Sequence, residues 1–169
     1  LIARGVDDAQ AVVRAATGGG IALAAGVKGP VMGGIISDRW GRAASAAAIF
    51  ALSGACSWAI GWTGDFPWPI IIGLAIVYGW AISADSAIYS TAITEVAEYA
   101  RLGSTMAIQA FLGFSGGIVG PIVVGAILDA SSESWGLGFS SVGVVAVVAV
   151  AVLLRVRSAT QGAALASGD

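Results

Sequence analysis

The sequence contains no histidine, a single cysteine and few charged residues, and each shortage narrows what the chain can do. Without histidine, most zinc sites and every mechanism in which an imidazole activates a serine are excluded. The lone Cys56 lies in an apolar run, so there is neither an internal disulfide nor a Cys-x-x-Cys site. No basic patch suggests nucleic acid. The sequence predicts a protein that is not an enzyme, with no cofactor, no metal and no nucleic-acid partner.

Charge is scarce throughout the chain. Only 11% of the 169 residues are charged, 57% are hydrophobic, and the mean hydropathy is +0.90. A soluble domain carries about 25% charged residues. The net charge of -2 says little, because nearly all the charges lie in short connections. We therefore expect lipid to surround most of the chain.

Five apolar segments are long enough to cross a bilayer, which takes about 20 helical residues at about 1.5 Å each. Strands of a membrane barrel would instead show about 10 residues of alternating character, and these segments do not alternate. The sequence predicts an all-α integral membrane fold whose five transmembrane helices cover residues 14–37, 43–62, 68–91, 104–128 and 136–154.

The regions outside the predicted bundle of residues 14–157 are short. We interpret residues 1–13, which mix charged and apolar side chains, as a non-cytoplasmic loop or an interfacial lead-in. Residues 158–169 are rich in alanine, glycine and serine, and we interpret them as a loose cytoplasmic tail.

The orientation follows from the arginines. With five spans, one side of the membrane holds five arginines and the other only one or two. Basic residues favour the cytoplasmic side. The turn at 38–42, the loop at 95–103 and the C-terminus are therefore predicted to be cytoplasmic, in a plasma membrane or a bacterial inner membrane.

A polar turn with the sequence Gly34-Ile-Ile-Ser-Asp38-Arg39-Trp-Gly41-Arg42 separates the first two apolar segments. Gly34 is expected to let another helix approach closely, and Gly41 to permit the tight turn. The Asp38 carboxylate ends one helix where the N-terminus of a neighbouring helix can lie. Arg39 and Arg42 can bind lipid phosphates or that same carboxylate. The turn is either a conformational gate or an ordinary loop with positive-inside arginines.

These turn residues resemble the best-known signature of the major facilitator superfamily of secondary transporters. That signature is Gly, three residues, Asp, a basic residue, one residue, Gly, one residue and then basic residues. Arg42 comes one position early for the basic cluster, and Ala43 stands where a second basic residue is expected. A second stretch, residues 95–107, resembles the family's loop between helices 10 and 11. A weak signature followed by three more helices resembles the second half of such a transporter.

The resemblance implies that the chain spans helices 8 to 12 and that an N-terminal half of the same polypeptide is missing. It implies secondary active or facilitative transport of a small solute by alternating access, with or without a coupled proton or ion. The lipid bilayer would surround the protein, and the turn would latch one conformation against a helix of the missing half. The alternative is a small non-catalytic membrane scaffold or assembly subunit.

Two ionisable residues are predicted to lie near the middle of the bilayer. Lys28 lies ten residues before Asp38, and Asp85 ten residues before Glu95. Both are therefore about 15 Å deep in a hydrocarbon core of about 30 Å. Charged groups at this depth are costly and usually functional, so the two either form an ion pair, line a substrate or coupling-ion pathway, or serve the structure alone. An unpaired Asp85 could carry a coupled proton.

Three further polar side chains are candidates for the same pathway. Helical spacing places Tyr78 and Tyr89 on the face of Asp85, where they either line the pathway or serve as packing residues. Gln109 in the fourth segment is a possible hydrogen-bonding partner for a solute.

Small residues and prolines mark the first and fourth segments. They are expected either to support close packing and bending of the helices or to be ordinary membrane-bundle residues. They are Gly29, Pro30, Gly33, Gly113, Gly117, Gly120 and Pro121.

The stretch around Ser115 matches a Gly-x-Ser-x-Gly nucleophile pattern. That chemistry needs a base to activate the serine, and the chain has no histidine to supply one. We therefore reject the serine-hydrolase interpretation.

Overall fold

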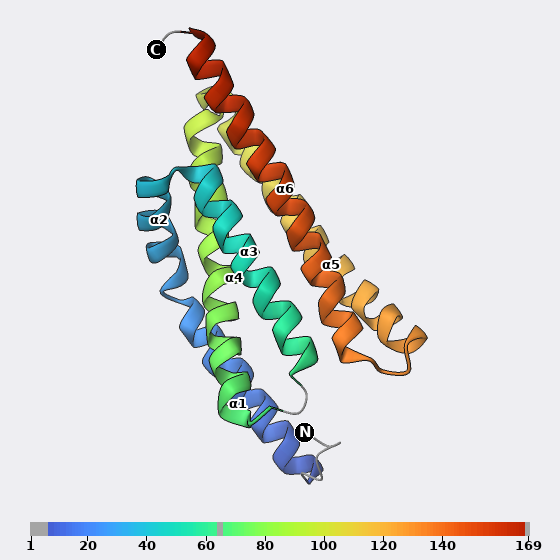
Figure 1. The fold of residues 1–169 in the computed structure, drawn as a ribbon. Helices are drawn as coiled ribbons and strands as arrows, with labels where there is room; N and C mark the ends of the chain where they lie inside the picture. Colours follow the sequence, from blue (N-terminus) through green and yellow to red (C-terminus); the bar gives the residue numbers. More distant parts are fainter. Residues whose placement is uncertain (1–6, 64–65, 168–169) are drawn as a thin grey trace.

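The computed structural model describes residues 7–63 and 66–167, with side chains up to residue 159. The described residues form long helices and no strand. In Figure 1 most of these helices run along one common direction. They are α1 (Asp8–Gly26), α2 (Gly29–Trp40), α3 (Arg42–Trp62), α4 (Trp68–Val96), the short 3-10 helix η2 (Tyr99–Arg101), α5 (Leu102–Ala130) and α6 (Trp135–Ser167).

The helices are long and apolar enough to cross a membrane. Four spans meet this description by themselves: Arg42–Trp62, Trp68–Val96, Tyr99–Ala130 and Trp135–Ala159. The pair α1 and α2 meets it together, with a bend of 42° between them, which gives up to five spans. The predicted all-α membrane fold is confirmed.

The first predicted span, 14–37, differs from the structure because helix begins at Asp8 and is interrupted after Gly26. Pro30 explains the interruption, since its nitrogen carries no proton for a bond to the carbonyl of Gly26. The same proline is well placed in the first turn of α2. The predicted lead-in is thus partly helical, and its residues 1–6 lie outside the described residues.

The C-terminal region also differs from the loose tail expected over residues 158–169. The α6 helix continues to Ser167, and residues 168–169 lie outside the described part of the chain. Alanine has the highest helix propensity, and the Ala-rich sequence lets the helix extend past the end of the apolar stretch.

Two sets of helix contacts hold the bundle together. The most extensive contact is between α3 and α6, and α4 packs against α1, α2 and α3. Alanine dominates the buried cluster between α3 and α4, formed by Ala46, Ile49, Ala81, Ala84 and Ile88. Small side chains let helices approach closely, which is how helices associate in lipid, where the hydrophobic effect gives no preference for helix contact.

Glycine contacts fix α2 against α4. A Cβ atom at Gly29 would lie 2.8 Å from the carbonyl oxygen of Trp80, and one at Gly33 would lie 2.5 Å from that of Ala84. Both positions therefore admit only glycine without a shift of the backbone.

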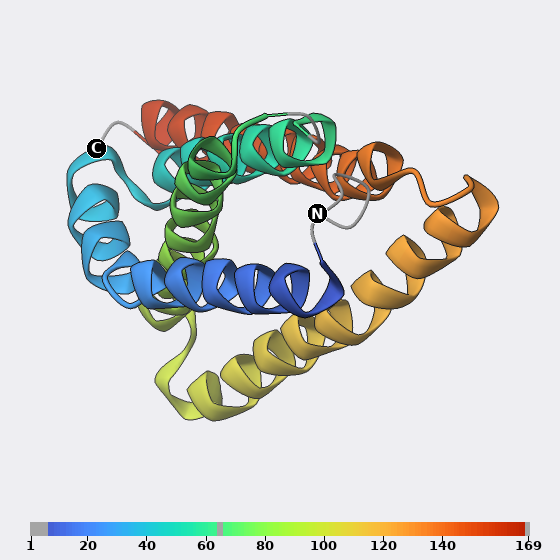
Figure 2. The ribbon, with the colours of Figure 1, turned by 90° about the horizontal axis from the view of Figure 1, so that it is seen from below.

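The α5 helix lies apart from these contacts. None of its residues is buried, and it contacts α6 and, less extensively, α4. Figure 2 shows it forming one side of the molecule by itself. The space beside Gly113, Gly117 and Gly120 is open, and Pro121 lies within the helix.

Candidate functional site

The polar turn is a sharp corner between α2 and α3. Gly41 alone separates the two helices, with φ 83° and ψ 152°. This conformation is essentially restricted to glycine. The amide of Gly41 donates to the carbonyl of Ser37 (3.0 Å), and its own carbonyl accepts from the amide of Ser45 (3.1 Å). The corner therefore closes one helix and opens the next without a loop.

Arg42 forms the centre of the polar contacts at this corner. Its Nη1 lies 2.7 Å from Asp38 Oδ1 and donates to the Ser37 hydroxyl. Its Nη2 donates to Glu95 Oε1 (2.6 Å), and its Nε donates to Glu95 Oε2 (3.1 Å). One guanidinium thus joins the end of α2, the start of α3 and the end of α4.

The bond from Arg42 to Glu95 is bidentate, the strongest and most directional form of an arginine–carboxylate contact. The Arg42 side chain is 24% exposed and that of Glu95 is 49% exposed. Ion pairs open to water add little stability. The contact therefore fixes the relative positions of the ends of α2, α3 and α4 and contributes little to the stability of the bundle.

The other turn residues have different surroundings. Arg39 is exposed and takes no part in the ion pairs formed by described residues. Beside Gly34 the space is open, and Gly33 makes the close approach to α4 instead. Among the described residues, no other helix comes within contact distance of a Cβ atom at Gly34.

Lys28 and Asp85 lie on different sides of α4. Lys28 occupies the break between α1 and α2 and is exposed, and its neighbour Gly29 packs against Ser83. Ser83 and Asp85 are two residues apart on α4, hence about 200° apart around the helix. No ion pair links Lys28 to Asp85 among the described residues.

The two tyrosines lie on the side of α4 that carries the half-buried Asp85, and this side faces α3. Tyr89, one turn beyond Asp85, places its ring edge-on to Phe50 of α3, with centroids 5.8 Å apart. Tyr78 lies beside Ser57 of α3. The Asp85 carboxylate is therefore flanked along α4 by two phenol groups.

Three buried polar atoms have no hydrogen-bond partner in the described structure: Gln109 Oε1, Trp80 Nε1 and Ser131 Oγ. Buried polar atoms are nearly always bonded, so each exception asks for an explanation. Gln109 lies on α5, the least covered helix, and its Oε1 atom is buried without a donor among the described residues.

The described residues contain no group of three or more histidine, cysteine, aspartate or glutamate side chains that could hold a metal ion. The sequence pattern of the turn does not predict that Arg42 pairs with Glu95. The only signal for it was the charged stretch that begins at Glu95, 53 residues further along the chain.

Long apolar helices, a charged corner at one end and isolated polar groups at their centre define a multi-pass helical membrane protein. The family model described as Major Facilitator Superfamily matches residues 9–169. The chain belongs to the major facilitator superfamily, a family of transporters. Neither the curated proteins nor the solved structures include a match to this chain.

Proposed function

We propose that the chain forms most of one helical bundle of a transporter that moves a small solute by alternating access. A second bundle would come from an N-terminal half of the same polypeptide. The observation that carries this proposal is the contact of Arg42 with Asp38 and Glu95. Alternating access is largely the rocking of one bundle against another, and such a bundle needs its helix ends joined so that they move together.

The solute pathway would run past the polar groups at the centre of the spans, where transporter sites usually lie. Lys28 shares a helical face with Met32 and Ile35, which are 46% and 51% exposed. A lysine at this depth is costly when it faces lipid. We infer that water, solute or the second bundle covers this face.

Asp85, Tyr78, Tyr89 and Gln109 complete the proposed pathway. A half-buried carboxylate beside Tyr89 can bind a cationic group of the solute or exchange a coupled proton. The unpartnered oxygen of Gln109 supports a role as hydrogen-bond acceptor. Lys28, on the other side of α4, would serve an anionic group of the solute at a different point of the pathway.

We also propose that the 38–42 corner, the 95–103 loop and the C-terminus are cytoplasmic, in a plasma membrane or a bacterial inner membrane. The arginine asymmetry supports this orientation. Labelling of single cysteines introduced at Arg39 and Arg101 with an impermeant maleimide should give the same sidedness for both. Opposite sidedness would refute the five-span topology.

The decisive experiment uses the transporter produced from its complete coding sequence and reconstituted in proteoliposomes. A thermal-shift screen across anions, sugars, amino acids and cationic drugs first identifies a stabilising solute, whose uptake is then measured. Lys28→Ala should weaken the binding of this solute, and Lys28→Arg should retain more of it. Unchanged affinity and uptake in both variants would remove Lys28 from the pathway.

A further inference from the structure

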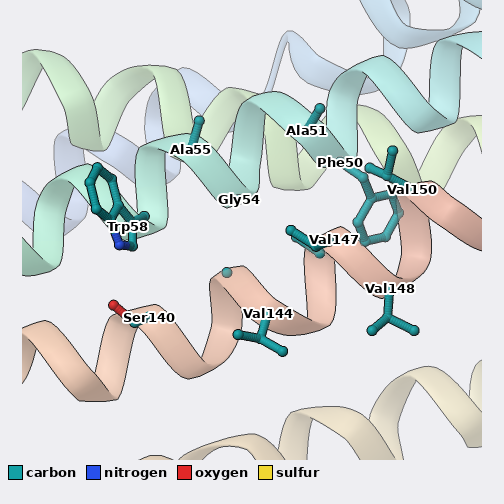
Figure 3. A pocket seen from close by; sticks show the side chains of 12 residues that line it. Phe50, Ala51, Gly54, Ala55, Trp58, Ser140, Val144, Val147, Val148 and Val150 are labelled. Carbon is teal, nitrogen blue, oxygen red and sulfur yellow. The ribbon is translucent and has the colours of Figure 1, made fainter.

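A groove of about 580 Å³ runs along the seam between α3 and α6. Its floor is formed where Gly54 meets Ala146, and Figure 3 shows Phe50 and Trp58 at its two ends along α3. Valines of α6 line the opposite wall. We call this feature the α3–α6 groove. It plays no part in the proposed solute pathway.

The α3–α6 groove opens outward rather than into the bundle. Trp58, Val144 and Val147 on its rim are 59%, 63% and 69% exposed. The hydroxyl of Ser140, its main polar group, already accepts a bond from Trp62 Nε1 (3.0 Å). In a membrane-spanning bundle, an outward hollow lined almost entirely by hydrocarbon suits a lipid tail rather than water.

A cation lies beyond one end of this groove. Arg155 follows Val144 by eleven residues, or about three helical turns, so it lies on the same face of α6 as Val144 and Val148. It is exposed and forms none of the ion pairs of the described residues. Along the helix it is about 12 Å from Val147, less than the roughly 15 Å of one hydrocarbon leaflet.

We propose that the α3–α6 groove binds one acyl chain of an anionic phospholipid whose phosphate pairs with Arg155. Ala48, Ala51 and Ala55 on this side of α3 are exposed, and their small side chains leave room for a tail along the groove. The charge of Arg155 selects an anionic headgroup, and each such basic residue near the surface contributes a preference of about fivefold. This proposal is independent of the solute and of the transport mechanism.

The test uses the complete transporter in nanodiscs that contain phosphatidylglycerol or phosphatidylcholine with a photoactivatable group in one tail. Cross-linked peptides are then mapped by mass spectrometry. We expect phosphatidylglycerol to label segments 50–58 and 140–150 about fivefold more than phosphatidylcholine does. Arg155→Gln should reduce this labelling to the phosphatidylcholine level. Arg101→Gln, which removes an exposed arginine of η2 rather than of α6, is the control.

A second pair of variants tests the groove itself. Ala51→Phe fills it at an exposed position, whereas Val145→Phe introduces the same ring on a face of α6 outside it. The first variant should lose the labelling and the second should retain it; should Ala51→Phe fail to fold, Ala55→Leu replaces it. Equal labelling by both lipids, no effect of Arg155→Gln, or cross-links from a second protein chain in the groove would each overturn the proposal.

Discussion

Arg42 and Glu95, 53 residues apart in the chain, meet through two parallel hydrogen bonds of 2.6 and 3.1 Å. Arg42 also contacts Asp38, so that one side chain connects three helices. Arg42 opens α3 directly after the corner at Gly41, and Glu95 lies in the last turn of α4. The corner thus fixes the direction in which the guanidinium leaves α3, and the length of α4 brings the carboxylate to it.

Removing Arg42 should impair transport more than removing Glu95. Arg42→Gln loses the contacts to Glu95 and Asp38, whereas Glu95→Gln leaves the bond to Asp38 intact. We expect a slower uptake rate in both variants, larger in Arg42→Gln, with little change in expression because exposed pairs add little stability. Proteoliposome uptake and detergent chromatography measure the two effects.

Exchanging the two charges of the pair is a more specific test of the contact than removing one of them. Arg42→Glu combined with Glu95→Arg restores opposite charges across α3 and α4, and it should recover part of the rate lost by either single exchange. Glu98→Gln is the control, because among the described residues Glu98 pairs with Arg101, three positions further along the chain, at 3.6 Å. A double exchange no better than the worse single one would contradict the role of the pair.

Gly41→Ala should destabilise the protein. Its φ of 83° with an extended ψ suits glycine alone, and a side chain there costs about 1–3 kcal/mol. We expect a lower melting temperature in a fluorescence-based thermal assay. Gly103→Ala is the control, because it lies in α5 with open space beside it. An unchanged melting temperature for Gly41→Ala would mean that the corner has another conformation.

Two adjacent glycines of α2 should respond in opposite ways. A Cβ at Gly33 would lie 2.5 Å from the carbonyl oxygen of Ala84, whereas none of the described atoms lies within 4 Å of one at Gly34. Gly33→Ala should cost about 1–3 kcal/mol through overpacking. Gly34→Ala should preserve or slightly raise stability, since alanine favours helix by about 1 kcal/mol. Melting temperatures of the two variants measured side by side decide this.

Gly34→Ala also tests whether a helix of the proposed N-terminal half packs against this residue. If a helix of the proposed N-terminal half packs against Gly34 in one state, Gly34→Ala will slow uptake without lowering the melting temperature. A normal rate together with normal stability would show that nothing approaches this residue closely.

The sequence was sufficient to predict the apolar spans, but it was insufficient to predict the contacts between them. Apolar run length is a local property, so α3, α5 and α6 were found from it, although α6 extends to Ser167. The interruption after Gly26 was not foreseen as a helix end, because a single proline within an apolar run bends some helices and divides others. The contact of Arg42 with Glu95 depends on how α3 and α4 pack, and neither segment encodes it alone.

The sequence predicts how deep a residue lies in the bilayer, but it does not predict the direction in which its side chain points. Counting residues from Asp38 and Glu95 predicts that Lys28 and Asp85 lie at one level of the bilayer, because the rise per helical residue is fixed, and this depth stays a prediction. Which way each side chain turns depends on the contact of Gly29 with Ser83, and this contact becomes visible only when α2 and α4 are packed.

The last prediction follows from that separation. Because Lys28 and Asp85 lie on different sides of α4, neutralising both should not rescue the effect of neutralising one. Groups without a shared partner contribute independently, so the losses of Lys28→Gln and Asp85→Asn in uptake should multiply in the double variant. A buried ion pair would behave differently, since the second neutralisation would remove an uncompensated charge. Uptake rates of the wild type, the two single variants and the double variant form the cycle, and recovery in the double variant would show that the two residues pair.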